Sequence, residues 1–168
     1  MPINERELLG ALSFDCVSKE KKWQPIDMYI LNPKKEKGDF YSLGGIGTLI
    51  FDEKTLDIML TVFEMAGEIL PVKLESQTLY ALNILECTNA LDEKNTKWDL
   101  YENGDRGRIL NYSFHKNRFP ESSLFKIPET SKTEIFTFSG MKDSADEFYS
   151  LYIQHDLKGL IFEDIYNL

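Results

Sequence analysis

The feature that most constrains the fold is the stretch 52–66, which has the pattern of an amphipathic helix. Asp52 suits the N-cap, and Glu53 lies in the first turn, where the helix dipole favours a carboxylate. Gly67 then supplies a stop signal. Apolar residues recur at helical spacing at Leu56, Met59, Leu60, Phe63 and Ala66. A helix with one apolar face must bury it, so the rest of the chain has to provide a second layer.

Short apolar and aromatic runs separated by turn residues provide that layer, as strands of a largely antiparallel sheet do. A second helix is predicted from Met141 to about His155, with Ser139 near its cap. The predicted fold class is therefore α+β, with a largely antiparallel sheet of about six strands and two main helices. The runs predicted as strands are 47–51, 69–74, 79–85, 109–114, 124–127, 134–138 and 160–162, with a shorter one at 28–31.

The chain of 168 residues suits one domain. No tract of Gly, Ser or Pro is long enough for a linker, and no repeat recurs at a fixed period. We therefore expect a single domain over 1–168. Within it, 1–39 mixes charged loops with one short strand and is treated as an N-terminal extension of a core over 40–168.

Composition excludes several classes of protein. Apolar residues make up 42%, which is too many for a disordered chain. The 19 Lys and Arg against 28 Asp and Glu give a net charge of −9, whereas nucleic-acid binding needs clustered basic residues. The charged start and the absence of any run near the roughly 20 apolar residues of a membrane span predict a cytoplasmic protein without membrane association. In that reducing compartment, two buried free thiols are favoured over a disulfide for Cys16 and Cys87.

Recognisable catalytic motifs are absent from the sequence. The glycine-rich run 43–48 lacks the Gly-Lys-Ser/Thr of a phosphate loop, and no nucleophile elbow, His-Glu-x-x-His or Cys-x-x-Cys occurs. We predict no catalytic residue, no cofactor and no metal. The alternative is an enzyme or small-ligand protein that uses the neighbourhood of Arg106, Arg108 and His115, near Asp105. Such a protein should show a deep pocket with convergent polar groups.

Two surface features are candidates for contact with a partner protein. Taking about 100° per residue, the acids of the first helix fall within about 60° of one another and form an acidic ridge, made of Glu53, Asp57, Glu64 and Glu68. The second feature is the loop from Asp92 to Arg108, which carries Trp98 and Tyr101; both residue types are enriched at binding hot spots. A solvated helix face and a core position for Trp98 are the structural alternatives. Turn residues at 103–108 predict an exposed hairpin tip.

Several segments resemble immunity family eleven of the bacterial polymorphic toxin systems, a family formerly filed as a domain of unknown function. The central segment Leu79–Asp92 is similar to the family's signature of tyrosine, leucine and asparagine followed by alanine, leucine and aspartate. Segment 47–53 is similar to the family's strand that enters a helix, and 67–72 is similar to the strand that follows. Segment 124–128 is similar to its phenylalanine-bearing strand, and 155–162 is similar to its closing helix with a glycine and an apolar strand. The resemblance covers about 40–168.

The resemblance implies a non-enzymatic immunity protein that binds and neutralises a cognate toxin domain. The family brings no established catalytic residues, so none is assigned here. A basic toxin domain suits the acidity of the chain, because charge complementarity speeds association. The predicted contact residues are Glu53, Asp57, Glu64, Glu68, Asp92, Trp98 and Tyr101. A module retained after its toxin was lost is a further alternative.

Overall fold

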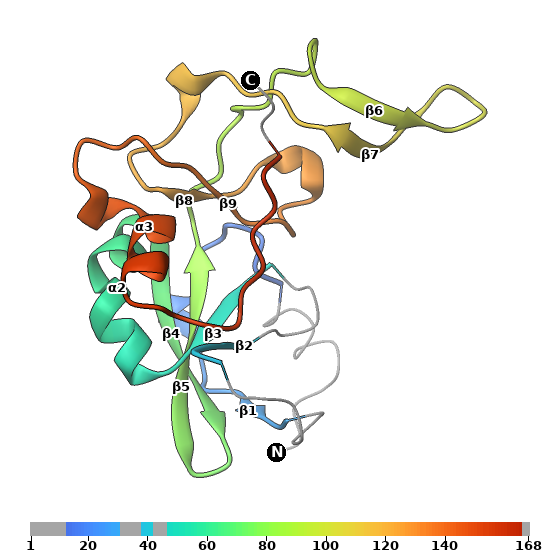
Figure 1. The fold of residues 1–168 in the computed structure, drawn as a ribbon. Helices are drawn as coiled ribbons and strands as arrows, with labels where there is room; N and C mark the ends of the chain where they lie inside the picture. Colours follow the sequence, from blue (N-terminus) through green and yellow to red (C-terminus); the bar gives the residue numbers. More distant parts are fainter. Residues whose placement is uncertain (1–12, 31–37, 42–46, 166–168) are drawn as a thin grey trace.

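The computed structural model describes residues 13–30, 38–41 and 47–165, and these adopt an α+β fold (Figure 1). The described helices are α2 (Glu53–Ala66) and α3 (Phe148–Gln154). The described strands are β1 (Asp27–Met28), β2 (Phe40–Tyr41), β3 (Leu49–Phe51), β4 (Gly67–Leu74), β5 (Gln77–Ile84), β6 (Lys97–Leu100), β7 (Arg106–Asn111), β8 (Leu124–Phe125) and β9 (Phe136–Thr137). Short 3₁₀ turns occupy Glu20–Lys22, Lys116–Arg118, Pro128–Thr130 and Ser144–Asp146.

The prediction of one largely antiparallel six-stranded sheet is wrong. The strands form a mixed five-stranded sheet in the order β1-β4-β5-β3-β2, and β6–β7 and β8–β9 form two separate two-stranded sheets. The main sheet is mixed because β1 pairs parallel with β4, placing Asp27 opposite Lys73. The longest ladder is the antiparallel pair β4–β5, which runs from Gly67 opposite Ile84 to Leu74 opposite Gln77.

The first predicted helix is confirmed at both ends. The Asp52 carboxylate accepts a hydrogen bond of 2.8 Å from the Thr55 amide, and the Gly67 amide donates to the Phe63 carbonyl. Its buried face consists of Thr55, Met59, Val62, Phe63 and Ala66, so Leu60 faces solvent instead of the core. Gly67 also begins β4, so the helix passes into the sheet without a loop.

The second predicted helix is shorter than expected. Ser144–Asp146 forms a 3₁₀ turn, and α3 begins only at Phe148. The residue between them, Glu147, has an extended backbone that breaks the helical path. Its buried carboxylate accepts hydrogen bonds from the Gly140 and Met141 amides and from the Ser150 hydroxyl. Residues 140 and 141 therefore serve as partners of this carboxylate rather than as a first helical turn.

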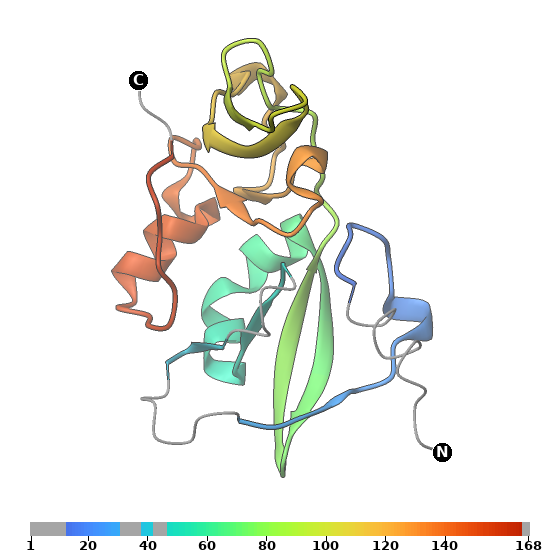
Figure 2. The same cartoon turned by 90° about the vertical axis from the view of Figure 1, so that its right-hand side faces the viewer.

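The two faces of the main sheet pack against different elements (Figure 2). Because side chains alternate along a strand, Leu82 and Ile84 of β5 pack with α2 and α3, while Leu79 and Ala81 face the opposite side. That opposite side is covered by the N-terminal segment, which buries Phe14. A third cluster, centred on Phe125 and Phe136, lies among β6–β9.

The described part of the predicted N-terminal extension is bound into the sheet. Trp23 Nε1 donates to the Pro71 carbonyl at 2.8 Å, and Asn83 Nδ2 donates to the Val17 carbonyl at 2.9 Å. Residues 1–12, 31–37 and 42–46 of the predicted extension and glycine-rich run lie outside the described residues, as does part of the short strand at 28–31.

The predicted strand at 160–162 does not form. This segment has no ladder partner among the described residues, and Leu160 and Phe162 pack against the helical core instead. Cys16 and Cys87 are free thiols, as expected, but the prediction that both are buried is wrong, since each is partly exposed. Among the described residues, no helix combines the length and the apolar character needed to cross a bilayer.

Candidate functional site

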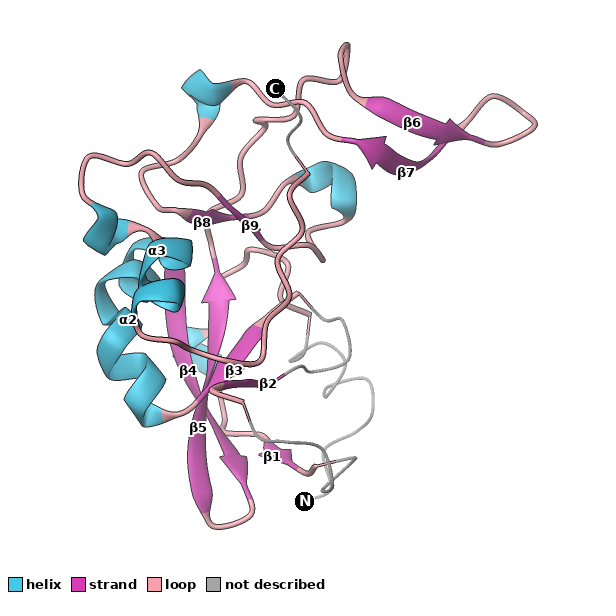
Figure 3. Cartoon of the chain, in the orientation of Figure 1, coloured by secondary structure: helices cyan, strands magenta, loops and turns pink. Residues whose placement is uncertain are grey.

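The β6–β7 hairpin projects from the body of the molecule (Figure 3). Its turn is held by two local hydrogen bonds of 2.9 Å each. The Tyr101 amide donates to the Asp105 carbonyl, and the Gly104 amide donates to the Tyr101 carbonyl. Gly104 has a φ of 86°, a conformation that glycine adopts without strain. The predicted exposed tip at 103–108 is confirmed, with Arg106 and its successors already in β7.

This hairpin carries large apolar side chains in contact with water. Leu100 is 63% exposed, Tyr101 is 66% exposed and Leu110 is 56% exposed. Singly exposed apolar residues are common, but these three all lie on one projecting hairpin. The side chains are already solvated and need no rearrangement of the core to reach a partner.

Trp98 anchors the hairpin rather than lying at its tip. Its side chain packs against the cluster of Phe125 and Phe136, and the Arg106 guanidinium lies 5.0 Å from the centre of its ring. Arg106 is fixed in turn by Glu93, 2.5 Å away. The ring is half-buried against this cluster, as the alternative of a core position implies, while its neighbours Lys97 and Asp99 are exposed; its contact with a partner stays a prediction.

Asp92 shapes the entry to the hairpin. Its carboxylate accepts hydrogen bonds from the Lys94 amide and from the amide and side chain of Asn95. These bonds, of which the one from the Asn95 side chain contributes most, lower the pKa of Asp92. Asp92 therefore acts as a turn-forming residue, and its carboxylate is largely occupied by hydrogen bonds from Lys94 and Asn95 of the same chain.

The predicted acidic ridge is shorter than expected. Glu53, Asp57 and Glu64 are exposed on α2, but Glu68 lies beyond the end of the helix, in β4. Strand alternation turns Glu68 toward the N-terminal segment, where its carboxylate accepts hydrogen bonds from the Lys19 amide at 2.8 Å and from Asn83 Nδ2 at 2.9 Å. Burial by itself would raise the pKa of Glu68, but these bonds and one from Ser18 outweigh it and lower the pKa. Glu68 is thus a structural residue.

The residues of the alternative active site pair with three different acids. Arg106 contacts Glu93, Arg108 Nε lies 3.8 Å from Asp99, and His115 Nε2 lies 3.9 Å from Asp92. Asp105 is bonded to Asn103 within the hairpin turn. The four side chains therefore do not converge on one reacting position.

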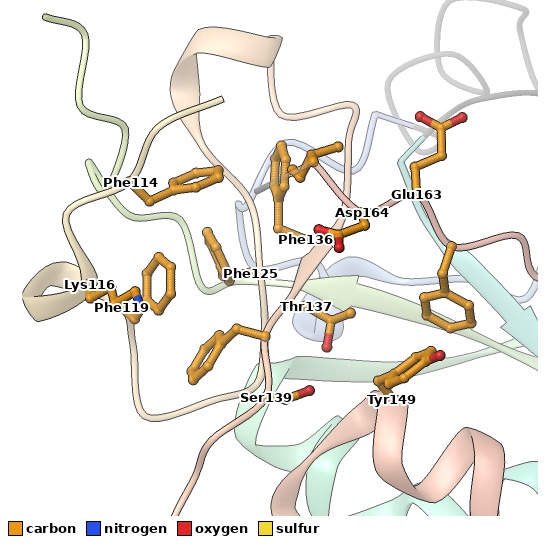
Figure 4. A pocket seen from close by; sticks show the side chains of 13 residues that line it. Phe114, Lys116, Phe119, Phe125, Phe136, Thr137, Ser139, Tyr149, Glu163 and Asp164 are labelled. Atoms are coloured by element: carbon orange, nitrogen blue, oxygen red, sulfur yellow. The ribbon is translucent and has the colours of Figure 1, made fainter. Parts of the chain in front are cut away.

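A cleft of about 470 Å³ lies beside β8 and β9, and the sequence analysis did not predict it (Figure 4). Its walls are rings contributed by distant parts of the chain: Phe114, Phe119, Phe125, Phe136, Phe138, Tyr149 and Phe162. The only sequence signal was the density of phenylalanine between 114 and 138, which is equally typical of a core. A neighbouring hollow shares Glu163, Asp164 and Ile165 with this cleft and reaches Ile109 and Leu110 of the hairpin.

A second feature missed from the sequence is a fully buried lysine. Lys126 Nζ donates to the Phe14 carbonyl, and burial lowers the pKa of Lys126. Burial, followed by the neighbouring Cys87, raises the pKa of Cys16 to about 11. A thiol with a raised pKa is a poor nucleophile. The cluster fastens the N-terminal segment to the sheet, and we assign it a structural role.

In the described parts of the chain, no three His, Cys, Asp or Glu side chains are grouped so as to hold a metal ion. Comparison with protein-family models finds no match for this chain, and comparison with curated proteins finds none either. The likeness to immunity family eleven thus rests on the segments quoted above.

Proposed function

We propose that this protein acts by binding another protein, and that the β6–β7 hairpin is the principal contact. The observation that carries the proposal is the exposure of Leu100, Tyr101 and Leu110 on an element that stands clear of the body (Figure 1). Tyr in particular gives a large contact area for little loss of side-chain freedom. An enzyme would need convergent polar groups, which the Arg106, Arg108 and His115 neighbourhood does not supply.

The hairpin is suited to docking because its conformation is fixed before a partner arrives. The bonds of the turn and the packing of Trp98 at the base limit its freedom. Binding therefore has a smaller entropic cost than it would for a flexible loop. A standard interface covers about 800 Å² of each protein, so surrounding residues must join the hairpin in the contact.

The acidic side chains of α2 contribute at a distance. In Figure 1, α2 lies at the left side of the main sheet and the hairpin lies at the upper right, so Glu53, Asp57 and Glu64 are removed from the proposed contact. Their charge, as part of the net −9, attracts a basic partner and raises the association rate. The proposed contact is thus the hairpin, and the carboxylates of Glu53, Asp57 and Glu64 act on the partner through long-range electrostatic attraction.

The finer proposal is that the partner is a bacterial toxin domain and that binding neutralises it. Its support is the resemblance of residues 40–168 to immunity family eleven, together with the acidity of the chain. Neutralisation of this kind needs a stable complex and no catalytic residue. The rigid hairpin supplies an element that can cover or enter a cleft of the toxin.

Tyr101→Ala tests the contact without disturbing the fold. Because the side chain is 66% exposed, its removal should leave the unfolding midpoint unchanged. Loss of a hot-spot tyrosine should weaken binding to the proposed toxin domain by about 1–2 kcal/mol, or roughly 5- to 30-fold in Kd. Isothermal titration calorimetry of the two purified proteins measures this difference.

Tyr29→Ala is the matched control. Tyr29 is 77% exposed but follows β1, far from the hairpin in Figure 1. Its removal should leave Kd unchanged. Equal affinities for the wild type and Tyr101→Ala would remove the tip of the hairpin from the contact.

A further inference from the structure

The N-terminal segment around Cys16 is held beside the end of β5. Lys126 Nζ donates a hydrogen bond to the Phe14 carbonyl, and Asn83 Nδ2 donates to the Val17 carbonyl at 2.9 Å. In Figure 2 the blue loop that begins the described chain runs beside the upper end of β5, in agreement with these bonds. Cys16 therefore lies between two carbonyl groups that are fixed by side chains from distant parts of the sequence.

Cys87 lies on the other side of the same contact. It follows β5 and forms an isolated parallel bridge with Lys126. In this bridge the Lys126 amide donates to the Glu86 carbonyl at 2.9 Å, and the Thr88 amide donates to the Lys126 carbonyl at 3.0 Å. Lys126 thus pairs through its backbone with Cys87 and through its side chain with the segment of Cys16, which brings the two cysteines together.

The thiols of the two cysteines are in contact. The Cys16 thiol donates a hydrogen bond to the Cys87 sulfur, and Lys126 interacts electrostatically with both sulfurs. Both cysteines are partly exposed, so a small reagent in solution can reach them. They are also the only two cysteines of the chain. Two sulfurs already directed at each other need only a local approach to reach the disulfide bond length of about 2.05 Å.

We propose that Cys16 and Cys87 are a redox-modification site, which closes into an intramolecular disulfide when the protein meets a small-molecule disulfide such as oxidised glutathione. In reducing compartments such disulfides are usually transient and redox-sensing. The open pair is then the resting form, and the closed pair is the response to an oxidant. Closure adds a covalent link between the N-terminal segment and the chain that follows β5. The inference goes beyond the proposed function and does not depend on the hairpin.

The reaction needs only the two thiols and the oxidant. Burial, followed by the charge and the hydrogen bond of Cys87, raises the pKa of Cys16, so the first attack is assigned to the Cys87 thiolate. Its sulfur bonds to one sulfur of oxidised glutathione, the S–S bond of glutathione breaks, and one glutathione thiolate leaves. Cys16 then loses its proton and attacks the Cys87 sulfur, which releases the second glutathione thiolate. The released thiolates take up the two cysteine protons, so two protein thiols are oxidised and one glutathione disulfide is reduced to two thiols.

The test equilibrates the full chain at fixed ratios of oxidised to reduced glutathione, blocks the remaining thiols with N-ethylmaleimide and measures the intact mass. The expected product is a monomer that carries no blocking group and has lost the mass of two hydrogen atoms. Proteolysis of this product should yield one linked peptide pair that contains Cys16 and Cys87. A persistent glutathione adduct, a disulfide-linked dimer or two blocked thiols at every ratio would each overturn the proposal.

The same equilibration in concentrated urea separates the contribution of the fold from the reactivity of any two thiols. A disulfide that suits the native structure should form about 30- to 1,000-fold more favourably in the folded chain than in the unfolded chain. An equal or smaller equilibrium constant in the folded chain would show that the fold does not bring the sulfurs together, and would overturn the proposal.

Single serine variants are the matched controls. The oxidised wild type should unfold about 5–15 °C above the reduced wild type, as followed by circular dichroism, because the link restricts the unfolded chain. Cys16→Ser and Cys87→Ser should each unfold at the same temperature in oxidising and reducing buffer, since neither can form the link. An oxidised wild type that gains no more than these variants would contradict the proposal.

Discussion

Replacing Gly67 with alanine is expected to destabilise the protein by about 3 kcal/mol or more. An alanine Cβ at this position would lie 2.0 Å from the Asn83 carbonyl oxygen and 2.8 Å from the Leu85 nitrogen. Neither atom can move by side-chain rotation, because both belong to the backbone beside the β4–β5 ladder. The direct passage from α2 into β4 therefore requires glycine, and urea denaturation monitored by circular dichroism measures the loss.

Gly104→Ala is the matched control for this change. Gly104 has no heavy atom within 4 Å of its would-be Cβ, so only its left-handed backbone, with a φ of 86°, opposes the substitution. The expected loss is about 1 kcal/mol, the strain of a non-glycine residue in this conformation. Equal losses for the two variants would contradict the assignment of Gly67 to a close backbone contact.

Glu147→Ala should destabilise the protein by about 2–3 kcal/mol, because three hydrogen bonds to a carboxylate that is only 5% exposed are lost together. The Gly140 and Met141 amides and the Ser150 hydroxyl would then depend on water. We expect faster hydrogen exchange at the amides of 140 and 141 and a lower unfolding midpoint. An unchanged midpoint would show that this carboxylate does not hold the start of α3.

The same carboxylate should impose a pH dependence. The Ser150 hydrogen bond, followed by those from Gly140 and Met141, lowers the pKa of Glu147 below its ordinary 4.5. A lowered folded-state pKa gives stability that is fully present above pH 4.5 and is lost as the pH falls through the folded-state value. Glu147→Gln should therefore flatten the acidic limb of the profile of unfolding free energy against pH.

Local signals predicted the elements that are controlled by local chemistry. Asp52 and Gly67 marked the helix ends because capping and stop signals act within a few residues. The prediction of the buried helix face was less accurate, since Leu60 is exposed and Val62 is buried in its place. The position of the sheet, and not the sequence of the helix alone, decides which of two neighbouring apolar residues is covered.

Long-range pairing could not be obtained from one sequence. The parallel pairing of β1 with β4 places Asp27 opposite Lys73, and no local sequence pattern predicts this pairing. Glu68 was placed on the helix because the 3.6-residue period was extended past Gly67, where the period changes to two. Glu147 fell inside the helix predicted from Met141, yet its side chain accepts hydrogen bonds from the Gly140 and Met141 amides, which precede α3.

The candidate site was predicted in part. Trp98 and Tyr101 were singled out by residue type, and the structure separates them into an anchored ring and an exposed one. The cleft was not predicted because its rings come from segments between 114 and 165, and a phenylalanine that lines a cleft has the same sequence pattern as one in a core. Only the packing distinguishes the two.

The most direct test of the central claim is co-expression of this protein with the bacterial toxin domain proposed as its partner, followed by size-exclusion chromatography of the lysate. Binding as the mode of action predicts restored growth together with a stable complex of the two chains. Restored growth without a complex would point to chemical reversal of the toxin's damage and would contradict the account. Neither growth nor a complex, with a toxin shown to be active, would also contradict it.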